Sequence, residues 1–275
     1  MLTFLKLAQE EVNVYVAGFF RFLFGFIIIL PYILKSKLTV FRTNHLKKHC
    51  FRAVLNLPSM LLYFSALVML PIEKVTAISF VVPFFVTILA VLFLGEKIYI
   101  YRTLALILGF IGMIVILRPG IINISIGVYM ALASSLMWSV VIIITKSIAK
   151  DDSSITILSY GYTIMTILSF IIALSYWQTP TLQTLVYLFF AGFFGTLLHL
   201  CINHAYKLVD VSVTQPYSFL SLVFASLIGF YVFNEKPDLF TWIGASVIFL
   251  GVLIISYREM KLEKEIIRKS IDIKN

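Results

Sequence analysis

The sequence has few charged residues and very little cysteine. Charged side chains make up 13% of its 275 residues, whereas hydrophobic residues make up 61% and the mean hydropathy is +1.01. A soluble domain carries about a quarter charged residues, so this chain lacks the polar side chains that would cover its apolar surface. The two cysteines, Cys50 and Cys201, supply neither a disulfide framework nor a metal-binding set. The composition therefore indicates a chain that folds in lipid.

Sequence signatures of enzymes and of nucleic-acid binding are also lacking. The chain has no metalloprotease signature, no phosphate-binding glycine loop and no pair of aspartates within an apolar segment. The net charge is +9, and Lys and Arg crowd into one early loop and the C-terminal tail, where basic residues suit membrane orientation. We therefore expect a non-enzymatic membrane protein that has a lipid bilayer around it and uses no nucleic acid, cofactor or metal.

Apolar segments that suit membrane spans fill most of the chain. A helix that crosses the hydrocarbon needs about twenty apolar residues. Nine segments qualify, approximately 13–34, 53–70, 73–94, 101–117, 125–146, 155–176, 182–203, 211–233 and 239–257. Most connections between them are very short, so consecutive helices should be antiparallel neighbours. The sequence thus predicts an all-α integral membrane bundle with nine spans and no separate soluble domain.

Basic residues predict the orientation of these spans. The loop over residues 35–52 contains six basic residues and no acidic one: Lys35, Lys37, Arg42, Lys47, Lys48 and Arg52. Such a loop should be cytoplasmic, and so should the charged tail over residues 259–275, because eight spans separate the two. This orientation puts the N-terminus outside, although residues 1–11 resemble neither a span nor a translocation signal. We therefore expect that a helix before the first span is missing.

An internal repeat relates the two halves of the chain. A shift of 139 residues places Glu96 on Glu235, Lys97 on Lys236 and Gly112 on Gly251 without a gap. The predicted spans put Glu96 and Glu235 on opposite faces of the membrane, which defines an inverted-topology repeat, the architecture of secondary transporters. We predict a first repeat over residues 1–120 that lacks its first helix, a second repeat over residues 121–258, and a cytoplasmic tail. The Glu-Lys pairs should hold tight turns and not bind a ligand.

Four stretches resemble the drug/metabolite transporter superfamily, in particular proteins with paired EamA-type domains. They are "FFRFLFGFIIILP" from residue 19, "FVVPFFVTILAVLFLGEK" from residue 80, "GFIGMIVILRPG" from residue 109, and residues 215–238 with "QPYSFL" and "YVFNEKPD". The first and last stretches look most like S-adenosylmethionine uptake transporters of intracellular bacteria. The resemblance implies ten helices, a central cavity lined by the first four helices of each half, and fifth helices at the periphery.

The resemblance also implies a function. It suggests exchange or proton-linked transport of a small metabolite across the bacterial inner membrane, by a monomer or a homodimer. S-adenosylmethionine, an amino-acid-like compound or a nucleoside-like compound is the expected substrate. The missing first helix leaves open a decayed paralogue that does not transport, and a membrane-embedded enzyme is a weaker alternative.

Arg21 is the first candidate for a substrate-binding residue. It lies about eight residues into its helix, which is a depth of about 12 Å at 1.5 Å per residue. An arginine near the bilayer centre costs about 2.5–3.5 kcal/mol on insertion scales, so it should face protein or water. It could attract a carboxylate or phosphate of the substrate. Alternatively, it braces a neighbouring helix or extends toward the interface.

Polar and aromatic residues on other segments are further candidates for the cavity wall. His199 and Asn203 share a helix face whereas His204 lies on another, so a two-histidine metal site is poorly supported. Trp138 could stack on a ring of the substrate. Each of these residues could instead serve helix packing. The remaining candidates are Asn56, Ser59 and Tyr63 on one segment, Ser79 on the next, and Gln215, Tyr217 and Ser221 around a proline that frees a backbone carbonyl.

Overall fold

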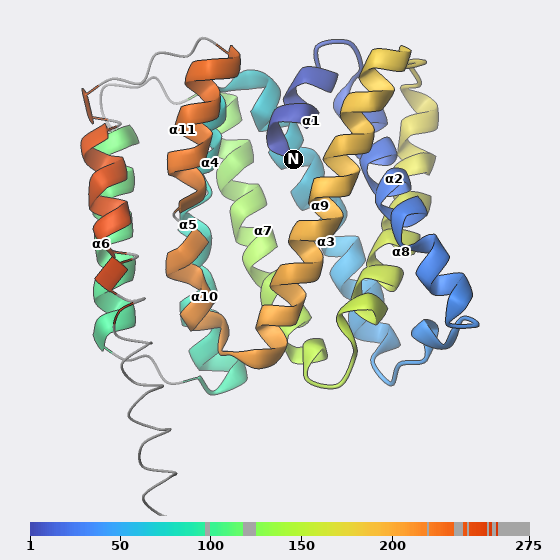
Figure 1. The fold of residues 1–275 in the computed structure, drawn as a ribbon, viewed down its shortest axis with the longest axis horizontal. Coiled ribbons are helices and arrows are strands. Elements are labelled where there is room, and N and C mark those ends of the chain that lie inside the picture. The colour runs from blue at the N-terminus through green and yellow to red at the C-terminus, as the bar shows by residue number, and fades with distance from the viewer. Residues whose placement is uncertain are drawn as a thin grey trace, which may run out of the picture.

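The computed structural model describes residues 1–96, 100–117, 125–218, 220–233, 239–240, 242–251, 253–254 and 257. In these ranges the chain forms helices and no strands, and the helices stand side by side as a bundle (Figure 1). The helices are α1 (Leu2–Ala8), α2 (Val14–Lys35), η1 (Thr39–Phe41), α3 (Leu46–Met69), α4 (Ile72–Ile78), α5 (Val81–Leu89), η2 (Ala90–Leu94), α6 (Ile100–Leu117), α7 (Ile126–Ala149), α8 (Ser154–Ser175), α9 (Leu182–Leu208), α10 (Val211–Ser218) and α11 (Leu220–Phe233). The predicted all-α fold is confirmed.

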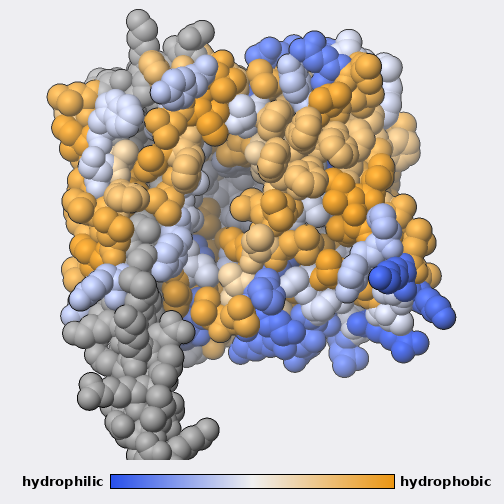
Figure 2. Space-filling model, viewed as in Figure 1, coloured by the Kyte–Doolittle hydropathy of each residue, from blue (hydrophilic) through white to orange (hydrophobic). Residues whose placement is uncertain are grey.

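Six helices are long and apolar enough to cross a membrane. They are Val14–Lys35, Leu46–Met69, Lys74–Leu94, Ile126–Ala149, Ser154–Ser175 and Leu182–Leu208. The other three predicted spans coincide with shorter apolar helices, Thr103–Val115, Val223–Phe233 and Trp242–Gly251. Hydrophobic side chains cover most of the visible outer surface at mid-height, and hydrophilic ones lie at its upper and lower edges, with more at the lower edge (Figure 2). The apolar bundle is thus as expected, while the count of nine spans stays a prediction.

Side-chain caps fix where several of the helices begin. Asn13 precedes α2, and its side-chain oxygen accepts hydrogen bonds from two backbone N–H groups at 3.1 Å each. Ser153 and Thr181 accept one such bond at the starts of α8 and α9. These residues satisfy N–H groups that a helix start leaves without a partner. Short polar connections can therefore end one long apolar helix and begin the next.

The helices pack in pairs that join the two halves of the chain. Helix α3 packs along α7, and α2 packs along both α8 and α9. Helix α6 lies at the edge of the bundle, next to residues 242–251 (Figure 1). A Cβ atom at Gly112 would lie 2.6 Å from the Gly244 oxygen, and one at Gly251 would lie 3.3 Å from the Ala105 oxygen. Glycine thus permits a close approach between these two peripheral helices.

The prediction of a loop over residues 35–52 is wrong for residues 46–52, which are helical. Helix α3 begins at Leu46, so Lys47, Lys48 and Arg52 are helical. Hydropathy places the start of the helix at its first apolar run, but here the first two turns are anchored by polar contacts. His49 Nε2 lies 2.8 Å from an oxygen of Asp152 in the α7–α8 connection. These contacts join the start of α3 to the opposite half of the chain.

One acidic residue at a helix end does more than hold its own turn. Gly95 follows η2 with a φ of 67°, a left-handed conformation that favours glycine. Glu96 then accepts a 2.9 Å hydrogen bond from the backbone N–H of Val211, where α10 begins. Glu96 therefore connects two halves of the chain as well as ending its segment. Its predicted counterpart Glu235 and the lysines of the two Glu-Lys pairs, Lys97 and Lys236, lie outside the described residues, as do residues 258–275.

Helix α1 is a short element packed against α9. Its seven residues are too few to cross a bilayer, and Leu5 and Ala8 are fully buried. The shift of 139 residues places Leu2–Ala8 on residues 141–147, which form the end of α7. In sequence position, α1 thus matches the last two turns of that helix.

Candidate functional site

A cavity of about 620 Å³ lies within the bundle. Residues from both halves line it, on α2, α3, α4, α5, α7, α8, α9, α10 and α11, and residues 1–3 also contribute. None of the described residues of α6 is among the lining residues, and none of those between positions 239 and 257 is either. The surface is hollowed between α9 and the α10–α11 pair (Figure 2). The volume suits a small organic molecule, since ligand sites measure roughly 300–1,000 Å³.

Ten of the eleven predicted binding residues line this cavity. They are Arg21, Asn56, Ser59, Tyr63, Ser79, Trp138, His199, Asn203, Gln215 and Ser221. The structure does not place Tyr217 with them, and that side chain is 38% exposed. Gln215, Ser218 and Ser221 follow one another at three-residue spacing and share a helix face. Tyr217 is two residues from Gln215, so it points to another side.

Arg21 is buried in the cavity wall. Its side chain is 4% exposed, and its Nη1 has no hydrogen-bond partner among the described residues. Its Nη2 lies 3.6 Å from the sulfur of Met1, and its guanidinium carbon lies 4.3 Å from the ring centroid of Phe22 and 5.9 Å from that of Tyr162. The burial contradicts the alternative in which the side chain extends toward the membrane interface. Arg21 is therefore a buried cation with hydrogen-bonding capacity to spare.

Arg52 is a cavity residue that the sequence analysis missed. It was assigned to the cytoplasmic loop, but it lies in α3 and lines the cavity. A signal for it existed, because Arg52, Asn56, Ser59 and Tyr63 follow one another at spacings of four, three and four residues. Such spacing puts side chains on one face of a helix. A predicted span extended by a single turn toward its N-terminus would have revealed Arg52 on the same face.

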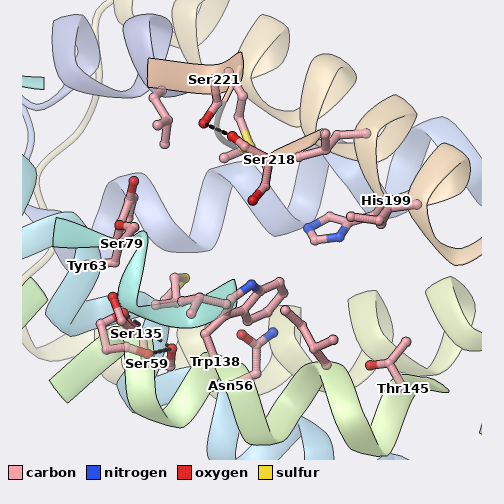
Figure 3. Close-up of a pocket in the computed structure, with 18 of the residues that line it drawn as sticks. Asn56, Ser59, Tyr63, Ser79, Ser135, Trp138, Thr145, His199, Ser218 and Ser221 are labelled. Atoms are coloured by element: carbon pink, nitrogen blue, oxygen red, sulfur yellow. Dashed lines mark hydrogen bonds between the residues drawn. The ribbon is translucent and has the colours of Figure 1, made fainter. Parts of the chain in front are cut away.

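Aromatic rings form another part of the wall. The Trp138 and His199 rings meet edge to face, with centroids 5.9 Å apart and planes at 62°. Both project into the cavity, and Asn56 lies beside Trp138 (Figure 3). His204 does not line the cavity. Over the described part of the chain no group of three His, Cys, Asp or Glu side chains is placed to hold a metal ion.

Several hydroxyl groups of the wall donate to backbone carbonyls. Ser59 and Ser134 join α3 to α7 reciprocally, because each hydroxyl donates to the other's backbone oxygen, at 3.0 and 2.7 Å. Ser79 and Ser221 donate to carbonyls of their own segments, at 2.8 and 2.7 Å. Ser59 therefore serves helix packing while it also lines the cavity. Each hydroxyl oxygen retains a lone pair that can accept a hydrogen bond from a ligand.

Comparisons with known proteins add family-level information. The sequence matches the EamA-like transporter family twice, over residues 1–118 and 125–257. It is 32% identical to an S-adenosylmethionine uptake transporter of Rickettsia bellii, over 93% of this chain and 88% of that protein. It is 29% identical to a riboflavin transporter of Rhizobium johnstonii, over 90% and 83% of the two chains. A solved crystal structure covers 95% of this chain and 94% of its own with a TM-score of 0.77 and 18% identity, which shows the fold alone.

Proposed function

Since the chain belongs to the EamA-like transporter family, we propose that it is a secondary transporter that works by alternating access in a bacterial inner membrane. Family membership makes it a membrane-embedded transporter of small metabolites and not an enzyme. The observation that carries the mechanism is the central cavity of about 620 Å³, which both halves line and which holds a buried Arg21. A transport cycle would expose this cavity to one side of the membrane at a time.

Two repeats of opposite orientation would provide the two states of this cycle. The shift of 139 residues places α2 on α8 and α3 on α9, with ends that differ by a few residues. In Figure 1, α2 descends whereas α8 ascends, which supports an inverted relation. The glycine contacts support it too, because Gly112 and Gly244 are the positional counterparts of Gly251 and Ala105. Such repeats can exchange conformations, so inward-open and outward-open states would have similar construction and energy.

The proposed division of the chain follows from this repeat. The first repeat would occupy residues 1–120, the second residues 121–258, and residues 259–275 would form the tail. The two separate family matches, over residues 1–118 and 125–257, support these boundaries. The cavity would then lie between the repeats, with the fifth helix of each at the periphery.

The proposed substrate is a metabolite with an anionic group and a planar ring. Arg21 offers a cation for a carboxylate or phosphate, and Trp138 and His199 offer ring faces and edges. S-adenosylmethionine, which has a carboxylate and an adenine, is the first candidate because relatives are named for its uptake. Riboflavin, for which other relatives are named, offers a ring system without an anionic group.

The proposed orientation puts the α2–α3 connection and the C-terminal tail in the cytoplasm. Basic residues concentrate in both places, as expected for cytoplasmic segments. Hydrophilic side chains lie at both edges in Figure 2 and are more numerous at the lower edge, the end of the bundle at which α2 meets α3. The protein would act as a monomer or a homodimer.

Uptake by liposomes that contain the purified protein tests this function. Labelled S-adenosylmethionine should accumulate with saturation kinetics and should be displaced by unlabelled substrate. Arg21→Ala should reduce uptake at least tenfold, roughly the loss of one charge-assisted hydrogen-bond pair. Arg42→Ala is the matched control, because Arg42 is exposed and lies outside the cavity. Equal uptake by the two variants would remove Arg21 from the site, and no uptake of labelled S-adenosylmethionine or riboflavin would contradict the proposed transport.

A further inference from the structure

Tyr162 of α8 carries a hydroxyl group that no contact among the described residues uses. The side chain lines the cavity and is 3% exposed. Its ring packs edge to face on that of Phe22, with centroids 5.8 Å apart. The hydroxyl, however, has no hydrogen-bond partner in the part of the chain that the structure describes. A buried hydroxyl without a partner destabilises a fold, so a tyrosine at this position requires a reason.

Arg21 has an unused donor beside this hydroxyl. Tyr162 interacts with the Arg21 charge, and its ring centroid lies 5.9 Å from the guanidinium carbon. Arg21 Nη1 also has no hydrogen-bond partner among the described residues. Thr196 is another neighbour of the Tyr162 hydroxyl, but it donates its own hydrogen to the Gly192 carbonyl at 2.8 Å. A cation and a phenol thus lie next to each other in the cavity wall, and each has a donor without an acceptor.

Two glycines make room for these two side chains. A Cβ atom at Gly195 of α9 would lie 2.9 Å from Arg21 Nη2. One at Gly25 of α2 would lie 2.8 Å from Tyr162 Cε2 and 3.1 Å from the Thr196 hydroxyl oxygen. A larger residue at either position would displace the guanidinium or the ring. Both groups are therefore closely packed from behind, as expected for polar groups that fix the orientation of a ligand in a mostly apolar cavity.

The cavity wall supplies no acidic acceptor for these donors. Among the described residues that line the cavity none is Asp or Glu. The Met1 sulfur, which lies 3.6 Å from Arg21 Nη2, is a weak acceptor and does not reach Nη1. A guanidinium only donates, and a phenol can donate to the same acceptor. An oxygen of a bound ligand can therefore satisfy both groups at once.

We propose that Tyr162 is a ligand-binding residue whose hydroxyl donates, together with Arg21 Nη1, to one oxyanion group of the ligand, a carboxylate or a phosphate. The proposal rests on the proposed transport function only in taking this ligand to be the transported metabolite. The guanidinium supplies the charge, and the neutral phenol adds a directional hydrogen bond to it. Tyr162 thereby helps to distinguish ligands that carry the anionic group from those that lack it.

Equilibrium binding to the purified full chain in detergent tests this site without requiring transport. Two ligand pairs share a ring and differ in the anionic group. They are adenosine with adenosine 5′-monophosphate, and decarboxylated S-adenosylmethionine with S-adenosylmethionine. In the unaltered protein the anionic member should bind at least about tenfold more tightly in one pair or in both, as expected for charge-assisted hydrogen bonds. The pair that shows the difference identifies phosphate or carboxylate as the recognised group.

Tyr162→Phe removes the hydroxyl and keeps the ring. It should weaken binding of the preferred anionic ligand at least about tenfold and change the affinity for the other member of the pair by less than about twofold. Tyr160→Phe is the matched control, because Tyr160 lies on the same helix and does not line the cavity. This control should bind all four ligands as the unaltered protein does. Equal affinities within both pairs, no binding of any of the four, or an anion preference that survives Tyr162→Phe overturns the proposal.

Thermal unfolding without ligand distinguishes a binding role from a structural one. The Tyr160 hydroxyl donates to the Phe41 backbone oxygen at 2.5 Å, so Tyr160→Phe should lower the unfolding temperature. Tyr162→Phe should leave it unchanged or raise it, because the hydroxyl that is removed has no partner among the described residues. A fall in Tyr162→Phe as large as that in Tyr160→Phe would show that the hydroxyl serves the fold, and would contradict the proposal.

Uptake by liposomes then separates this proposal from the proposed function. An anion preference that Tyr162→Phe removes, in a protein that takes up none of the four ligands, contradicts transport of these metabolites and leaves the binding site in place. Uptake that Tyr162→Phe leaves unchanged for both members of a pair contradicts the binding site and leaves the transport function in place.

Discussion

Removal of the Asp152 carboxylate should destabilise the protein strongly, because this group accepts hydrogen bonds from two side chains, those of His49 and Thr43. Its side chain is 8% exposed, and the side chain of His49 beside it is fully buried. The imidazole lies 2.8 Å and the Thr43 hydroxyl 2.6 Å from the same carboxylate oxygen. Asp152→Ala leaves the buried imidazole without this partner. Loss of a buried hydrogen bond to a charged group costs about 1.5–3 kcal/mol, and we expect the free energy of unfolding to fall by that amount.

The neighbouring residue provides a closely matched control. Asp151 occupies the same connection and lies 2.7 Å from another histidine, His45, but the two side chains are 66% and 24% exposed. Exposed pairs of this kind contribute about 0–1 kcal/mol, so Asp151→Ala should change little. Unfolding of both variants by SDS in mixed micelles gives the comparison. An equal fall in the free energy of unfolding in the two variants would refute the reasoning, because burial would then not determine how much each histidine–aspartate contact stabilises the protein.

Two further outcomes follow from contacts elsewhere in the bundle. Hydrogen bonds hold the pKa of the Glu11 carboxyl below its usual value of about 4.3, and the bond from Thr184 contributes more than those from Thr181. The ionised carboxylate therefore stabilises the fold fully above about pH 4.3, and this stabilisation is lost as the pH falls through the lowered pKa. Acid unfolding curves should show this loss, and Glu11→Gln should flatten it; an unchanged curve would contradict the assignment. At the peripheral helix pair, Gly112→Ala should destabilise more than Gly251→Ala, because the new Cβ would approach its nearest atoms to 2.6 Å in the first case and 3.2 Å in the second. Thermal unfolding in detergent measures the difference, and the reverse order would be inconsistent with the packing.

Most of the helices were predictable from the sequence because lipid imposes a simple rule. Backbone groups in hydrocarbon must be satisfied within the segment, so a long apolar run becomes a helix. Helix ends were less predictable, since they depend on polar contacts with distant residues. The start of α3 shows this, because the contact between His49 and Asp152 joins positions 103 residues apart. The bond from Val211 to Glu96 is another tertiary contact that local sequence does not reveal.

The cavity was predictable where a polar residue stands alone in an apolar run. Arg21 stood out because burial of its charge requires a reason, and helical spacing placed His199 and Asn203 on one face. Arg52 was missed because a cluster of basic residues resembles a cytoplasmic loop, although it shares a helix face with Asn56. Tyr217 was included because it adjoins polar residues in the sequence. Whether a residue lines the cavity depends instead on the helix face that it occupies, and Tyr217 lies on a different face from Gln215.

Alternating access is tested most directly by labelling a cavity position from each side of the membrane. Ser79 and Ser218 are counterparts in the 139-residue repeat, and both line the cavity. Each would be changed to cysteine in turn, in a chain whose Cys50 and Cys201 are replaced by serine, and treated with a membrane-impermeant thiol reagent. We predict that reagent on either side of the membrane reaches each position, and that substrate slows the reaction. Reaction from one side only, with and without substrate, would contradict the account.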